Sequence, residues 1–190
     1  MEKKPYRGPV FYFTHVPYLG EITKPEVQRS FANISKLTYS LKLAADLGIP
    51  IINEIGLTRD AKPFFDSLVR QMKTPPRIIE VNLTAEIIRR KMPDSKESDE
   101  AIVKDIIQKE KIEPTEFLFE GRETEMCVKR SIERIHSSFP FARLRLISGN
   151  YSVMGKGANR TLLKRDLERL GVKTSKKLSR GRLIRLIHRV

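Results

Sequence analysis

The stretch FEGRETEMCVKRSIERI, residues 119–135, predicts the end of a strand, a tight turn at Gly121 and a helix over 124–135. Cys127 falls in the first turn of that helix. Open N–H groups and the positive end of the helix dipole lower a thiol pKa there and can hold an oxyanion. A small buried cysteine that packs a helix against a sheet fits the same pattern. Both interpretations of Cys127 stay open on these residues alone.

Strands and helices alternate on both sides of this stretch. Apolar runs predict strands at 10–13, 49–55, 77–83, 117–119 and 144–147. Apolar residues at helical spacing predict helices at 26–47, 64–72, 102–111, 124–135, 159–170 and 182–190, with Ser98 as the cap of the third. This order predicts a mostly parallel sheet covered by helices on both faces, a three-layer α/β/α fold. The position of the 77–83 strand in the sheet stays open. A chain of 190 residues suits a single domain, 1–190, whose part from 156 to 190 is strongly basic.

The pattern strand–Gly–x–Glu–Thr–x–x–Cys–Val–helix resembles the signature of the isochorismatase-like cysteine hydrolases, especially the isochorismatase domain-containing branch. Other segments follow in the order that this resemblance requires. AADLGIPIINE (44–54) is similar to the family's helix that leads into its second strand, and Lys91 is similar to its catalytic lysine. GNYSVMGKGANRTLLKRDLERLGV (149–172) is similar to its late loop and arginine-led helix. The resemblance therefore covers nearly the whole chain.

The family's chemistry needs three groups, and the resemblance supplies two of them. A cysteine attacks a carbonyl carbon, an aspartate at the end of the first strand moves the proton, and a lysine stabilises charge. Cys127 matches the nucleophile and Lys91 the lysine, with Arg90 or Lys73 as alternatives. His15 stands where the aspartate is expected, in VFYFTHVP (10–17). The resemblance thus implies a catalytically degenerate member with vestigial Cys127, Lys91 and His15. A rebuilt Cys–His pair is the alternative.

Positive charge is concentrated at one end of the chain. The formal net charge is +14, and the residues from 122 onward carry 18 Lys/Arg against five acids. The first 121 residues are nearly neutral, at +1. Such asymmetry is typical of a nucleic-acid partner, although a solvated basic surface that aids solubility also fits.

The cations of this basic part lie opposite apolar residues in the two last helices and in the segment 173–182, which we expect to be a loop. We predict that they contact phosphates of RNA: Lys164, Arg165, Arg169, Lys173, Lys176, Lys177, Arg180, Arg182, Arg185 and Arg189. Aromatic residues are scarce nearby, with Phe139, Phe141 and Tyr151 in the region, so backbone contact is favoured over base stacking.

Composition limits the cellular compartments in which we expect the protein and the ligands that we expect it to bind. The start MEKKPYRGP lacks the apolar core of a secretory signal, so we expect a protein that is not secreted. One cysteine fits a reducing compartment. His15, His136 and His188 lack the spacing of metal ligands, and neither a metal nor a cofactor is expected. No apolar run approaches the roughly 18 residues that a membrane span needs.

The leading hypothesis is a non-catalytic, RNA-contacting structural component of a ribonucleoprotein, bound to ribosomal RNA and neighbouring proteins. A mitochondrial ribosome is the particle we favour, because such particles often recruit retired metabolic enzymes; the cytoplasm is the alternative compartment. Two other classes stay open. One is a cysteine-dependent amidase or related hydrolase that uses Cys127, and the other is a protein–protein scaffold, with an oligomer as its natural form.

Overall fold

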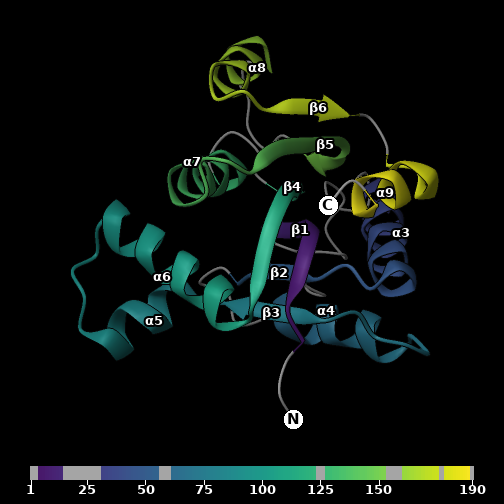
Figure 1. The fold of residues 1–190 in the computed structure, drawn as a ribbon, viewed down its shortest axis with the longest axis horizontal. Coiled ribbons are helices and arrows are strands. Elements are labelled where there is room, and N and C mark those ends of the chain that lie inside the picture. The colour runs from purple at the N-terminus through teal and green to yellow at the C-terminus, as the bar shows by residue number, and fades with distance from the viewer. Residues whose placement is uncertain are drawn as a thin grey trace.

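The computed structural model describes residues 4–14, 31–55, 61–122, 127–152, 160–175 and 178–188. Within them, six parallel strands form one sheet in the order β3-β2-β1-β4-β5-β6, with helices on both faces (Figure 1). The strands are β1 (Tyr6–Thr14), β2 (Ile51–Glu54), β3 (Ile78–Val81), β4 (Ile112–Arg122), β5 (Arg143–Ser152) and β6 (Lys173–Ser175). The helices are α3 (Phe31–Leu47), α4 (Ala61–Arg70), α5 (Leu83–Arg90), α6 (Lys96–Lys109), α7 (Lys129–Ser138), α8 (Arg160–Arg169) and α9 (Arg180–Ile187). The predicted three-layer α/β/α fold is confirmed.

The two faces of the sheet carry separate apolar clusters. On β1, Val10 and Tyr12 belong to one cluster while Phe11 and Phe13 belong to the other, because successive side chains of a strand point to opposite faces. Helices α6, α7 and α8 cover the first face, and α3 and α9, with α4 beside them, cover the second (Figure 1). All four of these β1 side chains are at most 1% exposed, which explains the unbroken apolar run VFYF.

β1 lies at the centre of the sheet and brings the ends of its neighbours together. Its last residue, Thr14, is in register with Glu54 of β2 and with Gly121 of β4. The strand predicted at 77–83, whose position was open, is β3 at the sheet edge. Among the described residues, no helix combines the length and apolar character needed to cross a bilayer.

The start of α6 corrects one prediction. Ser95, not Ser98, caps this helix, because the Ser95 Oγ accepts a hydrogen bond from the Ser98 backbone N–H at 3.2 Å. The helix begins at Lys96, six residues before the predicted start at residue 102. Ser98 is buried within the first turn instead. The first turn of this helix consists of polar residues, so apolar periodicity does not detect it.

Helix α5 has no counterpart in the sequence prediction, and the physical reason is its lack of buried residues. Asn82 caps it, with its Oδ1 accepting from the Ala85 N–H at 3.0 Å. An ion pair of 2.7 Å between Arg90 and Asp105 holds it to α6. Polar contacts rather than an apolar stripe therefore define this helix.

The segment 173–182 is not loop throughout. Residues 173–175 form β6, with Lys173 in register with Arg145 of β5. The last helix starts at Arg180, two residues before the predicted start, because the Ser179 Oγ accepts a bond from the Arg182 N–H at 3.3 Å. The basic segment is therefore built onto the edge of the sheet.

Gly121 allows β1 and β4 to approach at the end of the strands. A Cβ at this position would lie 2.2 Å from the Thr14 carbonyl oxygen, a backbone atom that moves only if the strands part. We expect Gly121→Ala to lower the free energy of unfolding by about 3 kcal/mol through overpacking. At Gly171 φ is +70° and an added Cβ meets nothing within 4 Å, so Gly171→Ala should cost only about 1 kcal/mol. Urea denaturation measures the free energy of unfolding of both variants. Equal losses of stability would contradict the close approach of β1 and β4 at Gly121.

Candidate functional site

The carboxyl ends of β1, β2 and β4 form the edge of the sheet where α/β proteins bind ligands. Thr14 and Glu54 end β1 and β2. Cys127 is half-buried and, with Val128, forms a wide π-helical turn that leads into α7. Such turns often occur at functional sites. The sequence predicts Cys127 in the first turn of a helix over 124–135, whereas α7 begins two residues after it, at Lys129.

The Glu54 carboxylate is the centre of a polar network at this edge. Its Oε2 accepts hydrogen bonds from the Tyr12 Oη and the Ser131 Oγ, both at 2.7 Å. Its Oε1 accepts one from the Arg134 Nη1 at 3.0 Å. The Glu54 side chain is 12% exposed, so these three donors replace most of the water that a free carboxylate would bind.

Arg134 extends the network to α6. Its Nη2 donates to the Asp99 Oδ2 at 3.1 Å, and its side chain is only 8% exposed. Burial alone would lower the pKa of Arg134, but Glu54, Tyr12 and Asp99 more than compensate and raise it above the ordinary value. Desolvation, followed by the charge of Glu54, raises the pKa of Tyr12 well above its usual value of 10. Arg134 therefore stays charged and Tyr12 stays a neutral donor.

Ser131 connects this network to Cys127. Its Oγ lies 2.9 Å from the Cys127 carbonyl oxygen and accepts a hydrogen bond from the Thr14 Oγ1 at 3.2 Å. A hydroxyl has one hydrogen, so Ser131 donates either to this carbonyl or to Glu54 at any moment. The contact with Cys127 is made through the backbone, and it fixes where the turn before α7 lies.

Sequence reasoning missed Glu54. The search for an acid was confined to the end of the first strand, where His15 stands outside the described residues. The carboxyl ends of parallel strands share one edge of a sheet. Glu54, the last residue of IPIINE (49–54), could therefore have been predicted to lie near the end of the first strand. Thr14 and Glu54 are register partners, so the acid lies one strand away from the expected position.

Lys91, the match to the family's catalytic lysine, and its alternatives Arg90 and Lys73 lie apart from this network. Lys91 is exposed, adopts a left-handed conformation with φ of 53° and caps α5. An eight-residue helix, about 12 Å long, separates it from the end of β3. Arg90 is held by Glu86 and Asp105, and Lys73 is exposed after α4. Lys91 therefore serves the turn between α5 and α6.

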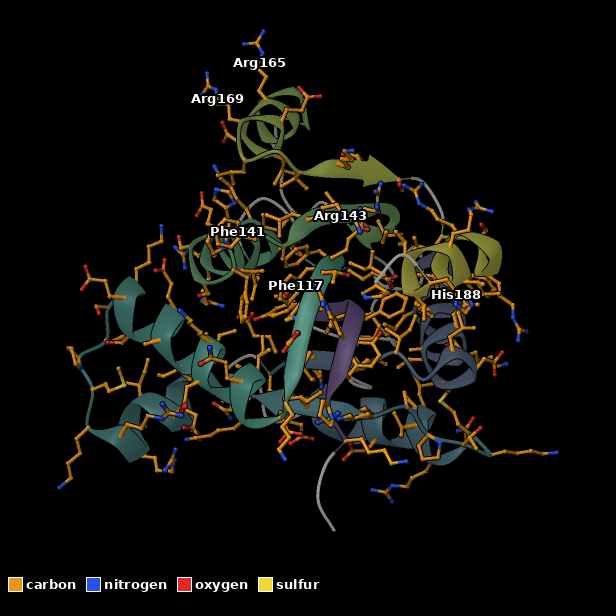
Figure 2. The ribbon with its side chains drawn as sticks, in the orientation of Figure 1. Phe117, Phe141, Arg143, Arg165, Arg169 and His188 are labelled. Atoms are coloured by element: carbon orange, nitrogen blue, oxygen red, sulfur yellow. The ribbon has the colours of Figure 1, made fainter. Side chains whose placement is uncertain are left out.

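The predicted RNA-contacting cations lie around the β6 edge but not on one face. Arg165 and Arg169 project from α8, and Figure 2 shows both pointing away from the sheet. Arg182 and Arg185 lie on α9, which covers the opposite face. Lys173 is exposed on β6 itself, and Arg180 faces Asp46 at 3.7 Å. The side chain of Lys164 and all of Lys176, Lys177 and Arg189 lie outside the described residues.

Metal ligands do not gather in the part of the chain that the structure describes. No group of three or more His, Cys, Asp or Glu side chains is arranged there to hold an ion. His136 and His188 are exposed near the ends of α7 and α9.

Comparison with known proteins identifies the fold and goes no further. No protein-family model matches the chain, and no curated protein matches it in sequence. A MAR1 ribonuclease from Caenorhabditis elegans is similar in structure, with a TM-score of 0.60 and 10% identity over 98% of this chain and 85% of that one. An isochorismatase from Pseudomonas putida gives 0.56 and 11% over 92% and 91%, and N-carbamoylsarcosine amidase from Thermoplasma acidophilum gives 0.52 and 8% over 90% and 99%. The chain has the isochorismatase-like hydrolase fold.

Replacing Arg134 by methionine keeps most of the side-chain length and removes both ion pairs. We expect Arg134→Met to lower the free energy of unfolding by about 3 kcal/mol, because Glu54 and Asp99 lose the cation that they share. Arg130→Met, at an exposed position of the same helix, is the matched control and should change it by less than about 0.5 kcal/mol. Urea denaturation at pH 7 compares the two, and similar effects would contradict a central role for Arg134.

Proposed function

We propose that this protein is a non-catalytic member of the isochorismatase fold that contacts RNA as a structural component of a ribonucleoprotein. The observation that carries the proposal is the position of the charge. The part of the chain after residue 121 carries a net charge of +13, and its described cations include Arg143 and Lys173 on β5 and β6, Arg165 and Arg169 on α8, and Arg180, Arg182 and Arg185 on α9. Phosphate contacts need exposed cations and little else, and they supply most of the affinity in non-specific RNA binding.

The cations on α8 are available for such contacts. Lys129 forms a 2.6 Å ion pair with Asp166, one of the two acids of α8, and so offsets the charge of an acid beside Arg165. The Arg169 side chain is 79% exposed and lies 3.9 Å from Asp166, too far for a strong pair. The name ribonuclease, carried by one protein of the same fold, is consistent with an RNA partner.

The polar network at Cys127 supports the non-catalytic part of the proposal. The Glu54 carboxylate already accepts hydrogen bonds from Tyr12, Ser131 and Arg134, so its oxygens are engaged within the protein. Lys91, the match to the family's lysine, stands at the distant end of α5. The hydrogen bonds of Glu54 with Ser131 and Arg134 therefore hold α7 against the sheet.

Charge reversal tests the RNA contact. The triple variant Arg165→Glu, Arg169→Glu, Lys173→Glu should bind RNA at least tenfold more weakly and reduce the slope of log K against log salt by about 2. The control Lys42→Glu, Lys73→Glu, Lys96→Glu changes net charge equally at exposed positions elsewhere. Filter binding across salt concentrations measures both. If both variants lose the same RNA affinity, the effect depends on net charge alone, which would contradict a defined contact surface.

The particle is tested by sedimentation. If a mitochondrial ribosome is the partner, the native protein should co-sediment with mitochondrial ribosomal particles and leave them at high salt. Sedimentation with cytoplasmic ribosomes, or with neither, would overturn that choice of particle and compartment.

A cysteine hydrolase is the second candidate, favoured by the half-buried Cys127 at the start of α7 and its link through Ser131 to Glu54. Labelling with iodoacetamide across pH separates the two candidates, because Cys127 is the single cysteine of the chain. We expect the labelling rate to rise with pH, with a midpoint near the ordinary thiol pKa of about 8.5. The urea-unfolded protein is the control and should show the same midpoint. A thiolate that reacts fully below pH 7 would overturn the non-catalytic proposal.

A further inference from the structure

The end of the sheet opposite Cys127 carries an open groove of about 1160 Å³. It lies where β1, β4 and β5 begin, next to the last turns of α6 and α7. Four cations line it, Arg7, Lys104, Lys111 and Arg143, together with Phe141. We call this the strand-start groove. Glu113 is the one acid among the described residues that line it, and it is 78% exposed and 3.9 Å from Arg7.

Phe141 is the most unusual residue of the groove, because its side chain is 99% exposed. It stands on a tight turn that is itself well anchored. The Ala142 N–H donates to the Phe139 carbonyl at 3.0 Å, and the Phe139 ring packs 5.3 Å from that of Phe117 in the core. The turn therefore holds one phenyl ring inside and presents the other to solvent. Figure 2 shows Phe141 near the end of α7, with Arg143 at the start of β5.

A second, smaller pocket of about 330 Å³ adjoins the groove, since Arg143 lines both. Arg145, Lys173, Arg182 and Arg185 complete its cationic lining, from β5, β6 and α9. We call it the α9 pocket.

Glu116 is the one acid in the lining of the α9 pocket, and Arg145 engages it. The Arg145 Nε donates to the Glu116 Oε1 at 2.6 Å, and Glu116 is 1% exposed. The Arg143 Nε stands 3.7 Å from the other carboxylate oxygen, too far for a hydrogen bond. The buried pair is thus formally neutral, and Arg143, Lys173, Arg182 and Arg185 leave a surplus of positive charge for an anionic ligand.

We propose that the strand-start groove and the α9 pocket together bind single-stranded RNA, with one base stacked on Phe141 and neighbouring phosphates held by Arg143 and the α9 pocket. An aromatic ring beside a cationic groove is the combination that single strands require. A duplex fits it poorly, because its bases are stacked on each other and closed to Phe141. This inference rests on the RNA contact proposed above and assigns it to particular residues.

The proposal predicts a loss that depends on bases rather than on phosphates alone. Phe141→Ala should weaken binding of a fluorescein-labelled 12-nucleotide oligo(U) about tenfold in an anisotropy titration, as for the loss of one stacked base. Binding of inorganic polyphosphate and of an RNA hairpin stem should not change. Ile88→Ala removes an exposed apolar side chain from α5 and is the matched control, with no expected effect. Both positions are on the surface, so thermal unfolding should confirm that each variant folds.

A charge variant completes the test. Arg143→Gln with Arg185→Gln should weaken binding of oligo(U) and of polyphosphate alike. An unchanged affinity of Phe141→Ala for oligo(U), or an equal loss with all three probes, would overturn the proposal. If Arg165→Glu with Arg169→Glu on α8 reduces RNA binding while Phe141→Ala and the Arg143→Gln, Arg185→Gln variant do not, the RNA lies elsewhere, and this inference fails while the proposed function stands. If wild-type protein binds polyglutamate more tightly than oligo(U), the groove takes an acidic protein instead, and the inference fails. No salt-sensitive RNA binding by wild-type protein would overturn both proposals.

Discussion

The buried bridge from Glu54 through Arg134 to Asp99 is the interaction on which the arrangement of this molecule depends. It joins the end of β2 to α7 and α6, three elements far apart in the sequence. A guanidinium suits this place because its flat fork reaches two carboxylates at once and stays charged. The bridge fixes α7, whose two ends lead to the two regions of interest. Cys127 precedes the first residue of α7, and the turn that presents Phe141 follows the last.

The two ends of the sheet consequently have different chemistry. At the carboxyl end, acids and hydroxyls pair with one another and with Arg134, and their contacts are satisfied internally. At the amino end and along the β6 edge, cations outnumber acids and face solvent. Among the described residues, the surplus of cations therefore lies away from the edge of the sheet where α/β folds usually bind ligands.

Sequence reasoning recovered what local pattern encodes. The VFYF run lies in β1 and the first long helix ends just before Gly48, as predicted, because apolar runs and glycine stops act over a few residues. The turn predicted at Gly121 is not found there, because β4 continues through Gly121 to Arg122. The prediction failed where a structural feature produces no pattern in the local sequence. Helix α5 buries nothing, and the helix capped by Ser95 opens with a polar turn, so neither shows apolar periodicity there. Glu54 was missed because its partners, Tyr12, Ser131 and Arg134, lie 42, 77 and 80 residues away.

By itself, then, the sequence determined the α/β class, the basic end of the chain and the presence of a helix after Cys127. Composition and short-range periodicity are sufficient for these, since they reflect burial and local hydrogen bonding. Only the tertiary structure decided that α8 and α9 cover opposite faces of the sheet and that Phe141 faces solvent beside Arg143. It also decided that Glu54, rather than an acid on β1, is linked through Ser131 to the backbone of Cys127. Strand order and register set these neighbours, and both depend on contacts between distant segments that no short stretch of sequence contains.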